Sequence, residues 1–415
     1  MKVQLTDSPG SDKLRIVIRR HLQHKLRSLA RKFPLVTLMG PRQSGKTTLC
    51  RATFPAKAYV SLEDPDTREY ALKDPRGFLA DHAKGAILDE VQRAPGLLSY
   101  LQTDIDRRPT RGRFILTGSA NLALLESVTQ SLAGRTALLT LLPLGLDEVR
   151  RFGRRDDSLY GLLWRGSYPA VYDRELPPND WYAAYVGTYV ERDVRQMVNV
   201  GNLLSFQTFL KMCAARAGQL LNLSALGADC GISHVTARAW VSILEASFLV
   251  HRLPPFHSHL NTRLIKAPKL HFFDSGIVCY LLGIRDPQQL RNHPLRGAIF
   301  ETWAVSEIAK ARLHRGLPTN LCFYRDRKGL EVDAVVEAAR ELIAVETKSG
   351  QTVASDFFSS LDAFAQLIAT AERASPMKRI LVYGGSELQH RGRATVLPWS
   401  MIDRLDWERG TLGPR

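Results

Sequence analysis

The residues from Gly40 to Thr47 have the types and spacing of a phosphate-binding loop. They read Gly-Pro-Arg-Gln-Ser-Gly-Lys-Thr, which fits G-x-x-x-x-G-K-[ST], and they directly follow an apolar run. In such a loop the glycines let backbone N–H groups face the phosphates, Lys46 reaches the β and γ phosphates, and Thr47 ligates Mg²⁺. We therefore expect ATP and Mg²⁺ as cofactors. The nucleotide-binding residues that we expect are Gly40, Pro41, Arg42, Gln43, Ser44, Gly45, Lys46, Thr47 and Thr48.

A second apolar run, Ala86-Ile-Leu-Asp-Glu, ends in two carboxylates. Asp89 would hold the magnesium through water, so the metal-binding residues that we expect are Thr47 and Asp89. Glu90 would orient and deprotonate the attacking water, because hydrolysis needs a base beside the γ-phosphate. The alternative is an ordinary strand end with solvated acids, and the loop upstream favours the functional interpretation.

Two further polar groups could complete a hydrolytic site. The run Phe114-Ile-Leu-Thr-Gly-Ser has a polar end, and either Ser119 or Thr117 could contact the γ-phosphate or the lytic water. Arg135 could supply the positive charge that phosphoryl transfer needs, either in cis or to a neighbouring subunit, although surface arginines are common. The catalytic residues that we predict are Glu90, Lys46, Ser119 and Arg135.

The C-terminal third holds a separate set of acids and a lysine. Side chains two apart on a strand share a face, so Glu346 and Lys348 could form one metal site with Asp333 from a neighbouring strand. Glu301, on the helical stretch 297–310, could approach the same site. These residues match the PD-(D/E)xK nuclease pattern, in which carboxylates hold Mg²⁺ and the lysine stabilises or activates water. The alternative is a hairpin with surface acids, in a fold that does not cut.

The elements that must position these residues follow from apolar periodicity. A helical period over 12–31 predicts a leader helix, and helical patterns such as 181–198 and 203–217 replace the strands after Leu144. Strand-like runs separated by helical or polar stretches predict a parallel sheet covered by helices, at 35–39, 58–62, 86–88 and 114–116.

A helix-turn-helix pattern comes next along the chain. Residues 223–230 predict a short helix, Gly231 a turn, and Ser233 the N-cap of a second helix that runs to about Ala246. The strand-like runs 248–253 and 269–273 would then form a wing.

DNA contacts would come from the start of the second helix and from the wing. The residues that we expect to contact DNA are His234, Thr236, Arg238, Arg263 and Lys266, and Lys269 would lie on the same wing. The alternative is a packing or assembly module, and we expect Trp240, Ile243 and Leu244 in its core.

The overall composition favours a polyanionic partner. The chain has 57 Lys and Arg against 41 Asp and Glu, a formal charge of +16 and a pI near 9.8, so we expect DNA as a partner. The five cysteines form no C-x-x-C pair, which indicates reduced thiols in a cytoplasmic protein and no zinc site. Charges interrupt the apolar positions near the start, and no apolar run reaches about twenty residues, so we expect neither a signal peptide nor a membrane span.

The chain resembles the bacterial and archaeal AAA-type ATPases that carry a C-terminal domain of unknown function. The resemblance spans nearly the whole chain and implies an ATPase core, a winged helix and a restriction-endonuclease-like end, without an established biological role. The stretches that carry it are Gly40-Pro-Arg-Gln-Ser-Gly-Lys-Thr-Thr, Ser61-Leu-Glu-Asp-Pro, Leu88-Asp-Glu-Val-Gln, Leu116-Thr-Gly-Ser, Ser131-Leu-Ala-Gly-Arg and Val345-Glu-Thr-Lys-Ser-Gly.

We therefore expect an α/β chain with a P-loop NTPase parallel sheet, a helical lid, a winged helix-turn-helix and a C-terminal restriction-endonuclease-like α/β domain. The expected segments are a leader helix at 1–30, an AAA-type P-loop ATPase core at 31–145, a helical lid or linker at 146–217, a winged helix at 218–285, a PD-(D/E)xK nuclease-like domain at 286–400 and a tail at 401–415 that is frayed after Leu405.

Two functions fit these segments. The first is an ATP-hydrolysing, DNA-processing or defence protein, in which the nucleotide state controls DNA engagement. The sequence leaves open whether this protein also has a Mg²⁺-dependent endonuclease activity. The second is a non-cleaving regulatory switch that binds a protein partner or operator DNA. A homo-oligomer is compatible with either function, and no particular protein partner is indicated.

Overall fold

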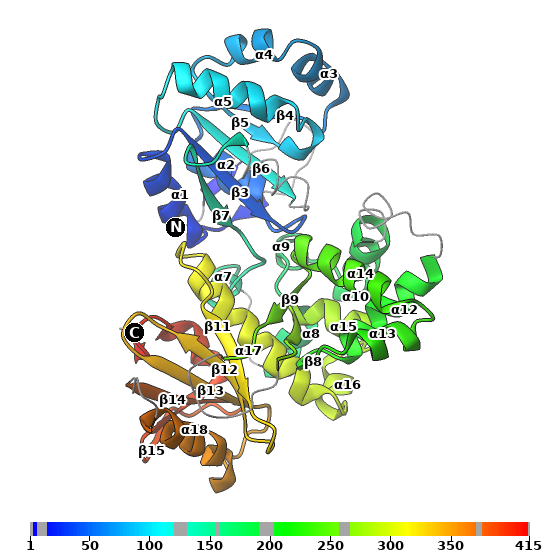
Figure 1. Ribbon diagram of the computed structural model, residues 1–415, viewed down its shortest axis with the longest axis vertical. Coiled ribbons are helices and arrows are strands. Elements are labelled where there is room, and N and C mark those ends of the chain that lie inside the picture. Colours follow the sequence, from blue (N-terminus) through cyan, green and yellow to red (C-terminus); the bar gives the residue numbers. More distant parts are fainter. Residues whose placement is uncertain are drawn as a thin grey trace. The chain divides into compact units, whose positions relative to one another are not determined.

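The computed structural model describes residues 3–5, 15–119, 131–153, 158–190, 203–256, 266–370 and 376–413 (Figure 1). The chain forms two compact units. Unit 1 comprises Met1–Pro143, Ala246–Phe248 and Leu313–Leu317, and unit 2 comprises Leu144–Glu245, Leu249–Arg312 and Pro318–Arg415.

Unit 1 is built on a parallel sheet in which β5 and β3 are not neighbours. Its five strands are β3 (Leu35–Gly40), β4 (Ala58–Ser61), β5 (Ala86–Asp89), β6 (Phe114–Ser119) and β7 (Thr136–Thr140). The order is β4-β5-β6-β3-β7, and every paired strand is parallel to its neighbour. The four predicted strands are confirmed, and β7 is an additional strand. The sheet order places the carboxyl end of β6 between those of β3 and β5.

Helices cover both faces of this sheet because side chains alternate along each strand. Val36 and Leu38 pack with helices α1 and α2, whereas Leu35 packs in a second core with helices α3 to α5 (Figure 1). The helices are α1 (Leu22–Ala30), α2 (Lys46–Thr53), α3 (Pro65–Lys73), α4 (Pro75–Asp81), the short η1 (Val91–Arg93) and α5 (Leu97–Arg107).

The predicted leader helix is wrong over its first part. Strand β2 (Arg15–Val17) pairs antiparallel with β1 (Val3–Leu5), and the helix begins only at Leu22. Ile16 and Val17 are β-branched, and β-branched side chains favour strands when a partner strand is present. The partner comes from the very start of the chain, so a helical period over 12–31 could not reveal it.

Unit 2 begins with a helical segment, as predicted. Its described helices are α7 (Leu146–Arg150), α8 (Leu159–Arg165), α9 (Pro169–Asp173), α10 (Pro178–Tyr185), the π-helical turn η2 (Val186–Val190) and α12 (Leu203–Ala215). The helix predicted at 181–198 therefore begins earlier and changes its pitch at Val186. The part of that prediction beyond Val190 lies outside the described residues.

Two helices joined by a turn follow at the predicted positions. Helices α13 (Leu223–Asp229) and α14 (His234–Ala246) flank Gly231, and the Thr236 N–H donates to Ser233 Oγ at 3.1 Å, which caps α14. A three-stranded antiparallel sheet lies in the same unit, with β10 (Lys269–Phe272) between β8 (Gln219–Leu220) and β9 (Val250–Leu253). The sheet is followed by α15 (Ser275–Leu281) and α16 (Pro287–Asn292).

The last part of unit 2 is a six-stranded mixed sheet of order β11-β12-β13-β14-β16-β15. Helix α18 packs on β12 and β13 through Leu361 and Phe364, which lie in one core with Val335 and Ala344. The elements are α17 (Arg296–Leu313), β11 (Leu321–Arg325), β12 (Glu331–Glu337), β13 (Leu342–Lys348), η3 (Ser355–Phe358), α18 (Ser359–Ala369), β14 (Met377–Tyr383), β15 (Gln389–Arg391), β16 (Ala394–Pro398) and η4 (Trp399–Arg404).

The segment predicted as a frayed tail is folded as far as it is described. Strands β17 (Leu405–Asp406) and β18 (Thr411–Leu412) pair antiparallel. Trp407 is only 1% exposed, its Nε1 donates to the Ile402 carbonyl at 3.1 Å, and its own carbonyl accepts from Arg312 Nη1 at 2.8 Å. A buried tryptophan with both polar groups paired holds this end of the chain on unit 2.

Candidate functional site

The loop between β3 and α2 has the backbone shape that a phosphate cradle needs. Gly40 has φ +156° and Gly45 has φ +92°, and a Cβ on Gly40 would lie 2.1 Å from the Leu141 carbonyl oxygen. Only glycine fits at position 40 for this reason. Ser44 is fully buried, and its Oγ has no hydrogen-bond partner within the described protein. An unpaired buried hydroxyl in a loop that ends at a helix N-terminus fits an anionic ligand.

Lys46 is folded back onto its own loop. Its Nζ donates to the carbonyls of Gly40 at 3.0 Å and Pro41 at 2.8 Å. Burial lowers its pKa from the usual lysine value, against the opposing effect of Glu90 and Asp89. An anion in the loop would stabilise the charged ammonium, because an opposite charge favours the ionised form.

Asp89 lies beside the predicted magnesium ligand Thr47. Thr47 Oγ1 donates to Asp89 Oδ2 at 2.9 Å, and Tyr59 OH donates to the same oxygen at 2.8 Å. Thr117 Oγ1 donates to the other oxygen, Oδ1. The hydroxyl and the carboxylate are hard oxygen ligands at one point, so these residues fit Mg²⁺ bound with a nucleotide.

Glu90 is held by two polar side chains at the carboxyl ends of the strands. Its backbone is left-handed, with φ 57° and ψ 44°, which is uncommon for a residue with a side chain. Ser119 Oγ donates to Glu90 Oε2 at 3.1 Å, and Gln92 Nε2 contacts both Glu90 Oε2 and, at 2.9 Å, Ser119 Oγ. Ser119 therefore lies with Glu90, while the alternative candidate Thr117 lies with Asp89.

Arg135 is at the wrong edge of the sheet to act on its own phosphate-binding loop. Its carbonyl accepts from the Leu35 N–H at the amino end of β3, whereas the loop follows the carboxyl end at Gly40. Five residues of strand separate these ends by roughly 16 Å. The Arg135 guanidinium also pairs with Asp106, with Nε–Oδ1 at 2.6 Å and Nη2–Oδ2 at 2.8 Å. Of the two alternatives left open for Arg135, this geometry does not favour the cis role, because parallel pairing fixes which strand ends meet.

Sequence reasoning missed Arg20, Tyr59 and Gln92. Arg20 is 6% exposed, and its guanidinium donates to the carbonyls of Ser44 at 2.8 Å and Leu142 at 2.9 Å. It therefore ties the phosphate-binding loop to the chain that follows β7. Gln92 comes two residues after Glu90, so its position in the sequence could have predicted their contact. Arg20 and Tyr59 have no such local link to the loop.

The C-terminal candidates also come together, in unit 2. Lys348 Nζ donates to Glu346 Oε1 at 2.8 Å, so the predicted shared face of β13 is confirmed. Asp333 Oδ2 accepts from the Thr347 N–H at 2.8 Å and from its Oγ1 at 2.7 Å. Glu301 lies on α17, which confirms the predicted helix, and reaches the same cluster through Lys269.

Lys269 corrects the prediction of an exposed wing residue. Its side chain is 2% exposed, and Nζ lies 2.7 Å from Glu301 Oε1, 2.6 Å from Glu331 Oε1 and 3.8 Å from Asp333 Oδ1. Burial acts to lower the pKa of Lys269, but these carboxylates outweigh burial and raise it above the usual value. The lysine is therefore charged inside the cluster.

The acids of this cluster are buried next to the Lys269 ammonium. Burial, followed by Asp333, raises the pKa of Glu301 to about 8 and that of Glu346 to about 7. Within the described part of the chain, no three His, Cys, Asp or Glu side chains are arranged to hold a metal ion. The resident ammonium of Lys269 places a positive charge beside these acids, and this charge would repel a divalent ion.

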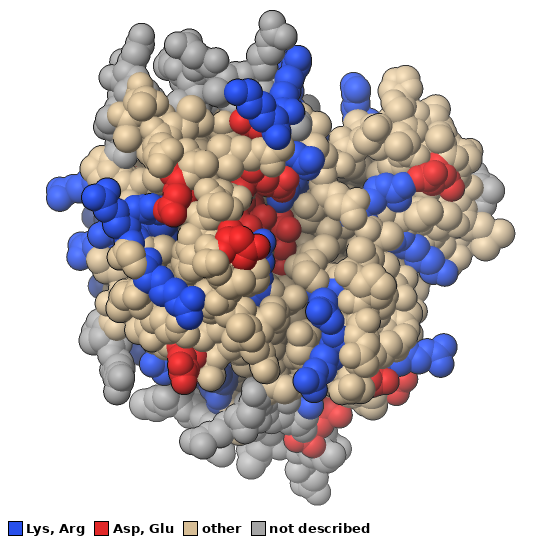
Figure 2. All heavy atoms as spheres, turned by 90° about the horizontal axis from the view of Figure 1, so that it is seen from below, with Lys and Arg blue, Asp and Glu red and all other residues tan. Residues whose placement is uncertain are grey.

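The predicted DNA-contacting residues differ in their exposure to solvent. His234 and Arg238 are exposed on α14, Thr236 is half-buried, and Lys266 is exposed before β10. Arg263 lies outside the described residues. Trp240, Ile243 and Leu244 are buried, as predicted. Figure 2 shows Lys and Arg side chains spread over one face, with acidic side chains gathered near its middle.

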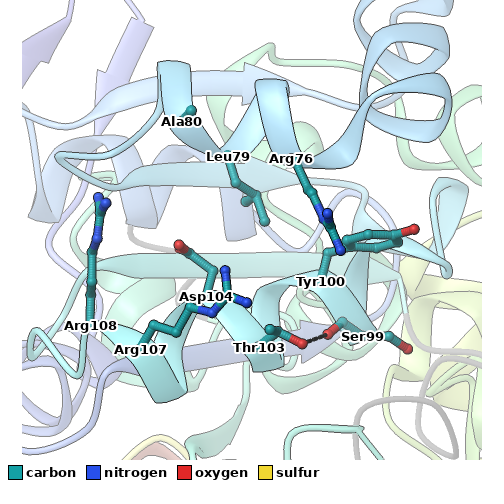
Figure 3. A pocket seen from close by; sticks show the side chains of 9 residues that line it. All are labelled: Arg76, Leu79, Ala80, Ser99, Tyr100, Thr103, Asp104, Arg107 and Arg108. Atoms are coloured by element: carbon teal, nitrogen blue, oxygen red, sulfur yellow. Dashed lines mark hydrogen bonds between the residues drawn. The ribbon is translucent and has the colours of Figure 1, made fainter.

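A separate hollow of about 450 Å³ lies between α4 and α5 (Figure 3). Arg76, Arg107 and Arg108 line it together with Tyr100, and all four side chains are exposed. None of its lining residues comes from the phosphate-binding loop or from β5, so the hollow is distinct from the nucleotide site.

Two further expectations concern the cysteines and the membrane. All five cysteines are buried and free of disulfides, as predicted. No helix among the described residues has both the length and the apolar character to span a bilayer.

Three family descriptions match successive parts of the chain. Residues 32–150 match an AAA domain, residues 156–288 match a domain of unknown function (DUF8612), and residues 296–402 match another domain of unknown function (DUF4143). The five-stranded parallel sheet and its phosphate-binding loop lie within the first match. The chain therefore contains an AAA-type P-loop ATPase domain in a mixed α/β fold.

Similar proteins extend the likeness without assigning a role. The uncharacterized proteins Rv2008c of Mycobacterium tuberculosis and Mb2031c of Mycobacterium bovis are each 28% identical over 341 residues, which are 81% of this chain and 75% of the relative. The Walker-type ATPase PABY2304 of Pyrococcus abyssi has a TM-score of 0.43 and 14% identity over 63% of this chain and 94% of that chain. AMPPCP-bound DnaA from Aquifex aeolicus has a TM-score of 0.28 and 15% identity, over 54% and 85% of the two chains.

Proposed function

We propose that unit 1 binds Mg·ATP at the loop Gly40–Thr48 and hydrolyses it. The observation that carries this proposal is the convergence of Lys46, Thr47, Asp89 and Glu90 at the carboxyl ends of β3 and β5. In parallel sheets covered by helices, ligands bind at this edge. The AAA domain match over residues 32–150 supports the same assignment.

Each residue has a distinct task in the proposed hydrolysis. Lys46 exchanges the carbonyls of Gly40 and Pro41 for phosphate oxygens when ATP binds, because an ammonium bonds more strongly to an anionic oxygen than to a neutral carbonyl. Thr47 and Asp89 would hold Mg²⁺, which neutralises charge on the phosphates. Glu90 orients the water and takes its proton.

Gln92 and Ser119 position the general base. Both lie against Glu90 Oε2, so the carboxylate has a defined orientation before the nucleotide arrives. Preorganised polar groups lower the cost of reaching the reactive arrangement. Ser119 therefore acts through Glu90 in this proposal, as well as lying within reach of the strand ends where the γ-phosphate would be placed.

We further propose that the nucleotide state controls DNA binding through unit 2. The support is the exposed start of α14, where His234 and Arg238 stand beside the half-buried Thr236, and the exposed Lys266. Side chains at a helix start can reach base edges or phosphates, and the net charge of +16 would favour the encounter. In this proposal, the α13–α14 segment acts as a winged helix.

We propose that the C-terminal sheet is restriction-endonuclease-like and that it binds DNA rather than cleaving it. The support is the contact of the Lys269 ammonium with the acids that a nuclease would use for Mg²⁺. This contact favours the non-cleaving switch. We propose DNA as the partner of the switch, and a protein is the alternative partner. In a homo-oligomer, Arg135 could serve a neighbouring copy only after leaving Asp106.

ATP hydrolysis measured with and without duplex DNA tests the proposed function, with a nuclease assay on the same preparation. We expect Mg²⁺-dependent phosphate release that changes when DNA is added, and no cutting of linear, supercoiled or branched DNA. An absence of ATP turnover under every condition would contradict the ATPase. Metal-dependent cutting that Asp333→Ala abolishes would contradict the non-cleaving proposal.

Replacing Arg238 and Lys266 together with alanine should weaken DNA binding uniformly across sequences. Each lost phosphate contact should reduce the slope of log affinity against log salt by about one unit. Fluorescence anisotropy of a labelled duplex, over a salt series and with or without ATP, measures both effects.

The control is the double variant Lys84→Ala/Arg111→Ala, which removes the same charge from exposed positions in unit 1. It should leave the slope nearly unchanged. If the wild type binds no DNA at low salt with or without ATP, the partner is a protein instead. An equal loss in both double variants would mean that only net charge matters.

A further inference from the structure

The acidic cluster of unit 2 already contains a cation. We propose that Lys269 is the resident cation of the cluster formed by Glu301, Glu331 and Asp333, and that it stands in the place of a divalent metal ion. This inference concerns unit 2 alone and does not depend on ATP hydrolysis in unit 1.

The geometry gives Lys269 the contacts of a bound ion. Its ammonium lies 2.7 Å from Glu301, 2.6 Å from Glu331 and 3.8 Å from Asp333, and it sits 5.5 Å from the centre of the Phe323 ring. The side chain is 2% exposed, so it is withdrawn from solvent. A buried ammonium needs such partners, because an unpaired charge in the interior is strongly unfavourable.

Several of the remaining carboxylate oxygens are also occupied, although Glu346 Oε2 is buried without a hydrogen-bond partner among the described residues. Asp333 Oδ2 accepts two hydrogen bonds from Thr347, and Glu331 Oε2 lies 3.1 Å from Arg325 Nη1. Glu346 Oε1 accepts from Lys348. A divalent ion would have to displace these donors and would lie beside the Lys269 ammonium, whose like charge repels it. The Lys269 ammonium therefore fills the position between Glu301 and Glu331, and its charge opposes a divalent ion at the neighbouring Asp333 and Glu346.

The resident lysine also joins three elements that are far apart in sequence. Lys269 begins β10, Glu301 lies on α17, and Glu331 and Asp333 lie on β12. A metal ion in this position would join the acids of α17 and β12 without the covalent link to β10, which would keep only contacts such as His271 Nδ1 with Thr302 Oγ1 at 3.2 Å. Within unit 2, Lys269 thus links the three-stranded sheet β8-β10-β9 to the six-stranded C-terminal sheet.

Mn²⁺ binding to the nucleotide-free, full-length chain tests this inference. The comparison uses wild type, Asp333→Asn, Lys269→Met, Lys269→Gln and Lys269→Met/Asp333→Asn, measured by electron paramagnetic resonance of free Mn²⁺. Methionine keeps most of the length of the lysine side chain and removes its charge. Thermal unfolding of each chain with and without Mn²⁺ is the second readout, because an ion that binds only the folded state raises the melting temperature.

We expect wild type and Asp333→Asn to show the same weak background of Mn²⁺ binding. Lys269→Met should gain one saturable Mn²⁺ site per chain and a melting temperature that rises with Mn²⁺, and adding Asp333→Asn should remove both gains. Lys269→Gln should behave like Lys269→Met. Together these results would establish that the lysine takes the place of a metal ion.

Two results would overturn the inference. The first is saturable Mn²⁺ binding to wild type that Asp333→Asn removes, which would show that the metal displaces the ammonium. The second is a folded Lys269→Met and a folded Lys269→Gln that gain no site. If neither lysine variant folds even with Mn²⁺ present, the comparison of wild type with Asp333→Asn still decides whether the cluster excludes metal.

Discussion

Replacing Lys46 with alanine should abolish ATP hydrolysis and weaken ATP binding. The variant loses charge-assisted hydrogen bonds to phosphate, and such bonds contribute about 1.5–3 kcal/mol each. One such bond corresponds to a loss of roughly 10- to 150-fold in affinity. Hydrolysis should fall further than binding, because the ammonium also stabilises charge that develops on the transferred phosphoryl group.

Phosphate release and binding of a fluorescent ATP analogue measure the two effects separately. Lys84→Ala is the matched control, since Lys84 is an exposed lysine of the same unit. Lys46 also donates to the carbonyls of Gly40 and Pro41, so circular dichroism should establish that the variant is folded. Turnover at the wild-type rate in a folded Lys46→Ala chain would refute the assignment of the nucleotide site.

Replacing Glu90 with glutamine should give a chain that binds ATP but hardly hydrolyses it. The carboxamide oxygen can still accept from Ser119 and Gln92, so the shape of the site is retained, but it cannot take a proton from water. Loss of a general base lowers rates by typically about 10²- to 10⁴-fold. The affinity for ATP should stay near that of wild type.

Single-turnover hydrolysis and equilibrium ATP binding, measured on the same chains, test this difference. Glu69→Gln makes the same chemical change at an exposed position on α3 and should be silent. Rapid hydrolysis by Glu90→Gln would identify another base. Loss of ATP binding would mean that Glu90 supports the fold of the loop instead.

The nucleotide site could be predicted from sequence because its parts are contiguous. The strand, the loop and the helix around Gly40–Thr47 follow one another along the chain, and the glycines mark the backbone turns directly. The run that ends in Asp89 and Glu90 is recognisable in the same way. The N-cap of α14 at Ser233 is also local, since its bond spans only three residues.

The partners within the site depend on how strands align. Thr117 meets Asp89, and Ser119 meets Glu90, because β5 and β6 are parallel neighbours. Sequence alone left the choice between these two side chains open. The parallel pairing of β7 with β3 likewise places Arg135 at the opposite end of β3.

In the C-terminal part, strand alternation was enough to predict that Glu346 and Lys348 share a face. It was not enough to predict their surroundings. A lysine at the start of a short strand has the sequence pattern of an exposed residue, and only the packing of β10 against α17 and β12 places Lys269 among carboxylates. The periodicity of apolar residues in the sequence predicts which residues of one helix or strand share a face. Which charges meet across elements is decided by tertiary packing, because the pairing joins segments more than thirty residues apart.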